Sequence, residues 1–219
     1  MSERSNREGD GSEKGEDGPF RYQMEVSDQE CPICGRKALR VYGRVDEIPH
    51  FGRVLEQFIQ CEACGYRISD VMCLEERDPS EYRYRVNSPD DVKVRVIRSP
   101  SGFLEIPELG IKVRPGPAAE GFVSNVEGVL RRIKEHVRMA ARWADREEAR
   151  ERAREILDRI EAALSGEDEI TLVLKDPYGH SAIVPEDEEK LEVRRLEEDE
   201  VKRLRSLILR GSLQGRETF

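Results

Sequence analysis

Two Cys-x-x-Cys pairs constrain the fold of this 219-residue chain more than any other feature. Cys31 and Cys34 form the first pair, Cys61 and Cys64 form the second, and residues 35–60 separate them. A pair at this spacing lets two thiolates converge on one ion, and the glycine after each pair suits a tight turn. The sequence therefore predicts two knuckles that hold one structural zinc ion, Zn²⁺. Four protein ligands close the coordination sphere, so this ion stabilises the fold and has no site for a catalytic water.

Other uses of the cysteines are less well supported by the sequence. A reducing cytoplasm disfavours disulfides, and thioredoxin-like redox chemistry needs only one such pair within a βαβ unit, which is not visible here. An iron site uses the same four ligands, so spacing alone leaves zinc versus iron open. The fifth cysteine, Cys73, lies in an apolar run, and we expect it to be a small buried hydrophobic residue.

The charge balance is acidic, with 46 Asp and Glu residues against 37 Lys and Arg residues and a net charge of −9. Proteins that bind the phosphate backbone usually carry a basic excess, so bulk affinity for nucleic acid is not expected. The sequence contains no apolar run of about 18 residues, the length that a membrane span needs. The first residues also lack the apolar segment of a secretory signal. We expect a soluble, cytoplasmic protein without a membrane partner.

The pattern along the chain predicts three parts. Residues 1–27 are polar, glycine-rich and acidic, and are predicted to form a disordered tail. Residues 28–76 hold both cysteine pairs between alternating segments, which predicts a zinc ribbon of antiparallel strands. Residues 77–215 alternate apolar and polar positions between turn signals, as in a meander or sandwich.

A change of period interrupts this second, β-rich part at about 124–165. Apolar residues there recur at helical spacing in two segments, which predicts an inserted helical hairpin. Ser124 and Glu127 have the spacing of a capping box, so we expect Ser124 to be the N-cap of the first helix. The fold class expected from the residues is α+β, with a zinc ribbon followed by a β-sandwich that carries the hairpin.

No catalytic residue is predicted. Phosphate-binding loops, zinc-protease helices and serine-hydrolase elbows have characteristic motifs, and the sequence contains none of them. The chain has only three histidines, His50, His136 and His180, and none of them lies in a metal-binding or nucleophile motif. We therefore expect a binding protein that is not an enzyme and has no small-molecule substrate.

Four segments resemble the motifs of the ZPR-type zinc-finger family, in the same order. The second knuckle, residues 61–67, resembles the family pattern C-x-x-C-G-[YW]-[RK]. Residues 106–109, 126–128 and 176–181 resemble the motifs I-P-E-L, V-E-G and D-P-x-G-N-S. The resemblance extends over about 29–200, and the single module is similar to the archaeal form of the family. One departure is His180, which stands where the family usually has Asn.

The resemblance implies a finger similar to that of the β subunit of translation initiation factor 2, followed by a double-stranded β-helix-like domain. It also implies a partner, a GTPase of the elongation factor 1-alpha type, and a chaperone-like role in its folding. Partner contacts could involve Asp176, Gly179, His180 and Ser181, although a strand-end turn explains the same residues.

The alternative function is RNA binding through the zinc ribbon. Residues 31–72 contain six basic and five acidic residues. A net charge of +1 gives little support to this alternative, although four of the basic residues lie between Arg36 and Arg44. Steep salt dependence would indicate nucleic-acid binding, whereas a complex with a GTPase should respond to its nucleotide.

Overall fold

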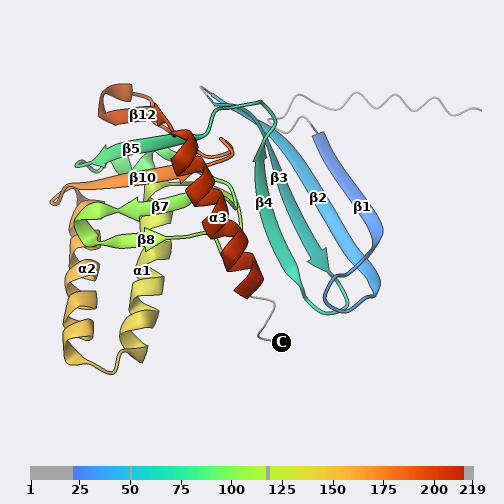
Figure 1. Cartoon of the computed structure of the whole chain (residues 1–219), viewed down its shortest axis with the longest axis horizontal. Helices are drawn as coiled ribbons and strands as arrows, with labels where there is room; N and C mark the ends of the chain where they lie inside the picture. Colours follow the sequence, from blue (N-terminus) through green and yellow to red (C-terminus); the bar gives the residue numbers. More distant parts are fainter. Residues whose placement is uncertain (1–21, 50, 117–118, 215–219) are drawn as a thin grey trace, which may run out of the picture.

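The computed structural model describes residues 22–49, 51–116 and 119–214 (Figure 1). Four antiparallel strands form the finger sheet in the order β1-β2-β3-β4. Their bounds are Tyr22–Glu30, Lys37–Ile48, Gly52–Cys61 and Arg67–Cys73. In Figure 1 this sheet stands beside a second body that carries the remaining strands and the helices.

The prediction of a disordered tail over residues 1–27 is wrong for residues 22–27. Residues 1–21 lie outside the described residues, but residues 22–27 are part of β1 and pair with β2 from Tyr22↔Val45 to Val26↔Val41. The segment Tyr-Gln-Met-Glu-Val does alternate apolar and polar residues. This alternation is short and follows an acidic, glycine-rich stretch, so composition alone predicted disorder. Pairing with β2 satisfies the backbone N–H and C=O groups of the segment, which stabilises it as a strand.

The second body is built on two sheets. The larger has the order β12-β5-β10-β7-β8, and the smaller has the order β11-β6-β9. In chain order, these strands are β5 (Ser80–Val86), β6 (Arg95–Arg98), β7 (Phe103–Ile106), β8 (Ile111–Val113), β9 (Phe122–Asn125), β10 (Ile170–Asp176), β11 (Ala182–Val184) and β12 (Leu191–Arg195). Apolar side chains from both sheets and from the first two helices form its main core.

The described residues also form three α-helices and three short 3-10 helices. The α-helices are α1 (Val126–Trp143), α2 (Glu147–Ser165) and α3 (Glu198–Gln214). The 3-10 helices are η1 (Asp91–Lys93), η2 (Pro107–Leu109) and η3 (Glu188–Lys190). Helices α1 and α2 form the hairpin predicted at about 124–165, and in Figure 1 they project away from the sheets. The expected α+β class, with a cysteine finger ahead of a β-rich body and an inserted helical hairpin, is confirmed.

Two junctions depart from the sequence pattern by small shifts, and the predicted N-cap is one of them. The N-cap of α1 is Asn125, whose side chain accepts a hydrogen bond from the Gly128 backbone at 2.8 Å, while Ser124 stays in β9 opposite Val96. Residues 92–96 also alternate apolar and polar positions, but Val92 and Lys93 lie in η1, and the strand β6 begins only at Arg95. Both segments lie at junctions, where side-chain hydrogen bonds decide the backbone path and residue periodicity does not.

The finger packs on the second body through a shared apolar core. Ile48, Phe51 and Val54 of the finger contact Ile97 of β6 and Ala182 of β11. The two bodies also join at the backbone, where the N–H of residue 121 donates to the carbonyl of residue 69 at 3.2 Å. These contacts fix one end of the finger and leave the end with the cysteine knuckles away from the core. None of the helices that the structure describes combines the length and the apolar character that a bilayer span requires.

Candidate metal centre

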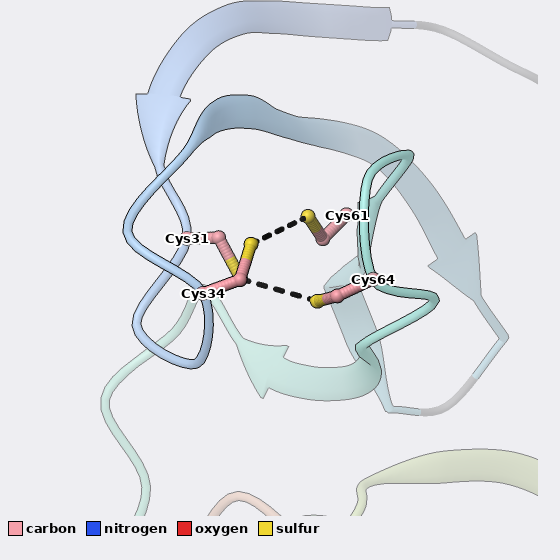
Figure 2. A group of neighbouring side chains, drawn as sticks. All are labelled: Cys31, Cys34, Cys61 and Cys64. Atoms are coloured by element: carbon pink, nitrogen blue, oxygen red, sulfur yellow. Dashed lines mark hydrogen bonds between the residues drawn. The ribbon is translucent and has the colours of Figure 1, made fainter.

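Two tight turns bring the four cysteines together at one end of the finger sheet (Figure 2). The first turn follows β1 and the second joins β3 to β4. In each turn the glycine after the second cysteine donates its N–H to the carbonyl of the first cysteine, at 2.8 Å for Gly35 and 3.0 Å for Gly65. Both glycines have a positive φ, +68° and +75°, which a side chain would strain. The glycines expected from the sequence are therefore required by the knuckle backbone.

The sulfur atoms have the spacing of a tetrahedral metal site. All four Sγ atoms lie within 4.8 Å of one another. The distance is 3.7 Å between Cys31 and Cys64, and also 3.7 Å between Cys34 and Cys61. Four sulfurs at about 2.3 Å from a central zinc ion would lie about 3.8 Å apart, whereas a disulfide needs about 2.05 Å. The residues therefore fit a four-thiolate metal ion and do not fit disulfides.

The thiol electrostatics also favour a cation. Burial opposes ionisation of Cys31, but backbone hydrogen bonds at Cys34 and Ile33 and the neighbouring thiols lower its pKa to about 7. The pKa of Cys64 shifts in the opposite direction. A backbone hydrogen bond at Tyr66 lowers it, but burial and the other three thiols outweigh that bond and raise the pKa to about 12. Cys31 and Cys64 therefore do not both ionise at neutral pH without a positive charge beside them. A divalent cation supplies that charge and stabilises every thiolate.

Very little apolar packing supports this end of the finger. Cys31 and Cys61 are buried with Leu39, and only half-buried neighbours surround them. One backbone hydrogen bond, from Glu62 to the Ala38 carbonyl at 2.9 Å, joins the two knuckles. An ion pair of 2.6 Å between Arg40 and Glu62 lies on the surface above them. Because this core is so small, a bound metal ion would provide most of the cohesion between the knuckles.

Cys73 lies outside this cluster. It is 4% exposed and packs in the core between the two bodies, near Phe51 and Val54. The group of neighbouring cysteines in the described residues contains Cys31, Cys34, Cys61 and Cys64 only. The interpretation of Cys73 as a small buried hydrophobic residue is confirmed.

The structure places the candidate partner residues of the motif 176–181 in two different environments. Asp176 and Ser181 are completely buried. The Asp176 carboxylate accepts hydrogen bonds from the hydroxyls of Ser99 at 2.7 Å and Ser101 at 2.8 Å, from the hydroxyl of Ser181, and from the Tyr178 backbone at 2.8 Å. These bonds tie the end of β10 to the turn between β6 and β7. Asp176 and Ser181 therefore have an internal structural role that the sequence pattern did not reveal.

The other positions of this motif differ in their exposure. Gly179 is buried with a φ of +75°, and a Cβ there would meet the Arg77 carbonyl oxygen at 2.4 Å. His180 is half-buried, and Tyr178 is 42% exposed with the Arg205 guanidinium 4.5 Å from its ring centre. A folded partner could reach Tyr178 and the edge of His180 without opening the domain. A partner contact at this motif stays a prediction.

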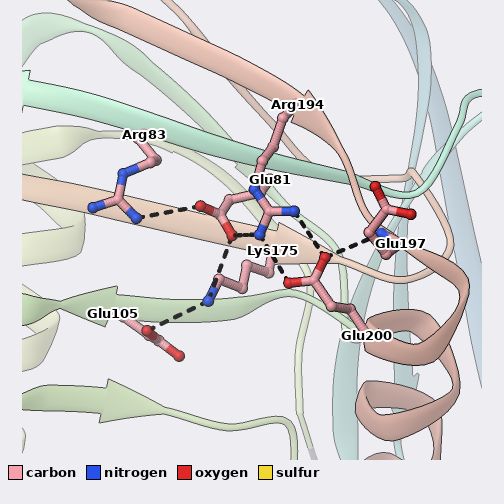
Figure 3. Close-up of polar contacts among 7 residues, drawn as sticks. All are labelled: Glu81, Arg83, Glu105, Lys175, Arg194, Glu197 and Glu200. Atoms are coloured by element: carbon pink, nitrogen blue, oxygen red, sulfur yellow. Dashed lines mark hydrogen bonds and ion pairs between the residues drawn. The ribbon is translucent and has the colours of Figure 1, made fainter.

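A second polar cluster, which the sequence did not suggest, joins the large sheet to α3 (Figure 3). Glu81 of β5 is only 3% exposed, and it pairs with Arg194 at 2.6 Å, Arg83 at 3.2 Å and Lys175 at 3.5 Å. Burial acts to raise the pKa of Glu81, but these cations lower it below its ordinary value. Arg194 also holds Glu200 in the first turn of α3 at 2.7 Å. Lys175 also pairs with Glu105 at 3.7 Å, so three carboxylates meet three cations, and the cluster anchors α3 to the sheet.

Known proteins resemble this chain along most of its length. The family described as the ZPR1 jelly-roll domain matches residues 90–205. An uncharacterised ZPR1-like protein of Pyrococcus horikoshii is 46% identical over 83% of this chain and 82% of its own length. A second ZPR1-like protein, from Methanocaldococcus jannaschii, is also 46% identical, over 82% of this chain and 90% of its own. The zinc finger chaperone zpr1 of Schizosaccharomyces pombe is 28% identical over 69% of this chain and 34% of its own length.

Proposed function

This chain belongs to the ZPR1 family, and from that membership we propose that it is a zinc-dependent binding protein for a translation elongation factor GTPase of the 1-alpha type. In this proposal the protein assists the folding or handling of that GTPase in the cytoplasm. It holds one structural zinc ion through Cys31, Cys34, Cys61 and Cys64, and it is not an enzyme.

The convergence of four cysteine sulfurs is the observation that carries the zinc part of the proposal. Their 3.7 Å separations match a tetrahedral zinc site, and a four-thiolate sphere leaves no open position for a substrate or a water. Iron accepts the same ligands, so metal analysis of the purified protein has to identify the ion. A zinc-to-protein ratio near one supports the proposal, and a reddish protein with bound iron would overturn the zinc assignment.

The partner part of the proposal is supported by kinship and charge. The Schizosaccharomyces pombe relative is named a zinc finger chaperone, and a net charge of −9 complements a basic partner such as a tRNA-binding GTPase. An exposed cluster at the first knuckle, with Ile33, Arg36 and Lys37 all accessible, is the observation that keeps RNA as the alternative ligand.

A binding assay with purified components separates these two functions. The zinc-loaded protein is titrated with the elongation factor GTPase in its GDP state, its GTP state and its nucleotide-free state, and in parallel with a structured RNA. We expect the GTPase to bind with an affinity that changes with its nucleotide. Affinity for RNA that falls steeply between 50 and 200 mM salt, with no binding of the GTPase, would overturn the proposal.

A further inference from the structure

The finger sheet has two faces, and one of them packs on the second body. Ile48, Val54 and Val71 belong to this inner face, because all three lie in the apolar core between the two bodies. Successive side chains of a strand point to opposite faces of the sheet, so the residues next to these three point away from the second body. We call that side of the finger sheet the outer face.

Strand register shows which residues share the outer face. Three rows of directly paired residues cross β2, β3 and β4 there: Val45–Leu55–Met72, Gly43–Gln57–Asp70 and Val41–Ile59–Ile68. The first and the third row consist of apolar side chains only. At the knuckle end the next pair is Leu39 with Cys61, so the outer face continues into the small core of the metal centre.

The apolar rows take little part in the cores of the protein. Within the described residues, the row Val45–Leu55–Met72 joins none of the apolar cores, and of the row Val41–Ile59–Ile68 only Ile59 does, beside the knuckles. Met72 is 42% exposed, and Leu74, directly after β4, is 41% exposed. A sheet with an apolar face usually buries it against another layer, and an apolar patch that stays open marks an interaction surface.

Asp70 is the charged residue of the middle row. Its cross-strand partner is Gln57, and its neighbours on the same face of β4 are Ile68 and Met72. The Asp70 carboxylate is half-buried and accepts a hydrogen bond from the adjacent backbone N–H at 2.7 Å, but it forms no ion pair with any described residue. A ligand that covers the outer face removes water from this carboxylate, which costs free energy unless the ligand brings a cation to it.

This requirement selects between the possible occupants. In a two-fold dimer the outer face would meet itself, and the three rows contain no lysine or arginine that could pair with Asp70. An extended segment lying across the face, away from a sheet edge, would leave its own backbone N–H and C=O groups unpaired. A helix satisfies these groups internally and can present an apolar stripe to the sheet.

We propose that the outer face binds an amphipathic helix of a partner protein. The apolar stripe of the helix packs on the two apolar rows, and one lysine or arginine within the stripe pairs with Asp70. This inference deepens the proposed function, because it rests on the partner being a protein and states which kind of segment the finger recognises. A client protein exposes such a helix while its own core is incomplete.

The test uses the zinc-loaded full chain and a fluorescein-labelled amphipathic peptide in a fluorescence-anisotropy titration. The peptide has about 15 residues, enough to form a helix when bound, with leucines at helical spacing and one arginine inside the apolar stripe. Two matched peptides carry glutamine or glutamate in place of the arginine, and a third has the same composition in an order without a stripe. We expect the glutamine peptide to bind about fivefold more weakly than the arginine peptide, and the glutamate peptide more weakly still. Equal affinity for the arginine peptide and the reordered peptide would overturn the proposal.

Charge reversal at Asp70 then locates the cation. Asp70→Asn keeps the size of the side chain and an acceptor for the neighbouring N–H, and it should make the arginine and glutamine peptides bind equally well. Asp70→Lys should reverse the preference, so that the glutamate peptide binds most tightly, because only a direct contact transfers the sign of the charge. An Asp70→Lys protein that still prefers the arginine peptide would show the proposal to be wrong.

A methionine pair tests the apolar row. Met72→Gln makes an exposed position of the first row polar and should weaken binding of the arginine peptide about threefold. Met139→Gln is the matched control, because Met139 on α1 is 45% exposed, and it should leave the affinity within about twofold of the unmodified protein. A control that loses as much affinity as Met72→Gln would contradict a site on the outer face.

Further outcomes separate this inference from the proposed function. If the GTPase binds the Asp70→Lys and Met72→Gln variants as tightly as the unmodified protein and no peptide binds, the outer-face assignment is wrong while the proposed function stands. If the peptides bind with the expected charge reversal but the GTPase does not bind, the function is wrong while the outer-face assignment stands. A dimer in sedimentation velocity that dissociates on Met72→Gln would show the outer face to be a contact between copies and would overturn the proposal.

Discussion

The substitution Asp176→Asn distinguishes a structural motif from a partner-binding one. In the structure one carboxylate oxygen of Asp176 accepts from Ser101 and from the Tyr178 backbone, and the other accepts from Ser99 and Ser181. Asparagine keeps an acceptor for the first two donors. It places an NH₂ group against the two remaining hydroxyls, so two hydrogen bonds to a charged acceptor are lost.

The expected loss of stability follows from these bonds. A hydrogen bond to a charged group contributes about 1.5–3 kcal/mol, and the two lost bonds therefore cost about 3–6 kcal/mol. Two effects offset part of this loss of stability: the neutral side chain no longer has to bury a charge, and the serine hydroxyls can rotate to other acceptors. The net destabilisation is then about 3 kcal/mol. With a urea dependence of about 2–3 kcal/mol per molar, the unfolding midpoint should fall by roughly 1 M.

The measurement is urea unfolding of the zinc-loaded protein at pH 7, followed by far-UV circular dichroism. Asp158→Asn is the matched control, because Asp158 is exposed on α2 and lies outside the family motifs; it should change stability by less than about 0.5 kcal/mol. An Asp176→Asn protein as stable as this control would refute the structural reasoning. If that stable variant also failed to bind the GTPase, the motif would instead belong to the partner-binding surface.

Two further predictions concern the metal and the pH. Cys61→Ser should abolish stoichiometric zinc binding and the slow amide hydrogen exchange of the knuckles. The amide of Val54, in the core between the two bodies, should stay protected from exchange. Loss of protection at both places, or at neither, would contradict this local role of the metal. Burial acts to raise the pKa of Asp91, but hydrogen bonds from Lys190 and from the Asn87 backbone outweigh it and hold the pKa at about 2. Because this pKa is below that of an unfolded Asp, about 3.9, the stability from Asp91 is present at pH 7 and is lost as the pH falls from about 5 toward 2. Asp91→Asn should therefore reduce the urea midpoint more at pH 7 than at pH 3, and an equal reduction at both values would be the opposite result.

The parts predicted well from the sequence depend on local patterns. Cysteine spacing predicted the knuckles, because two residues between thiols and a following glycine define a backbone turn whatever surrounds it. Helical spacing of apolar residues likewise predicted the α1–α2 hairpin. The parts predicted poorly lie at junctions, such as Asn125 and η1. At Asn125 one hydrogen bond from the Gly128 backbone to the side chain decides where the helix begins.

Long-range electrostatics could not be predicted from the sequence. Glu81 and Arg194 are separated by 113 positions, yet they pair at 2.6 Å in a buried cluster. In a chain with 38% charged residues, no local signal marks which Glu and Arg become partners. Strand register decides this, because β5 and β12 place the two residues directly opposite each other.

The sequence by itself therefore determined the metal-binding knuckles, the α+β class and the kinship of the chain, since each of these rests on residues that are close together or on motifs in a fixed order. Only the tertiary structure decided that Asp176 is buried and that Glu81 anchors α3. The physical reason is that these properties belong to packed surfaces. A side chain becomes buried, paired or exposed only when distant strands meet, and that meeting is decided by the whole core.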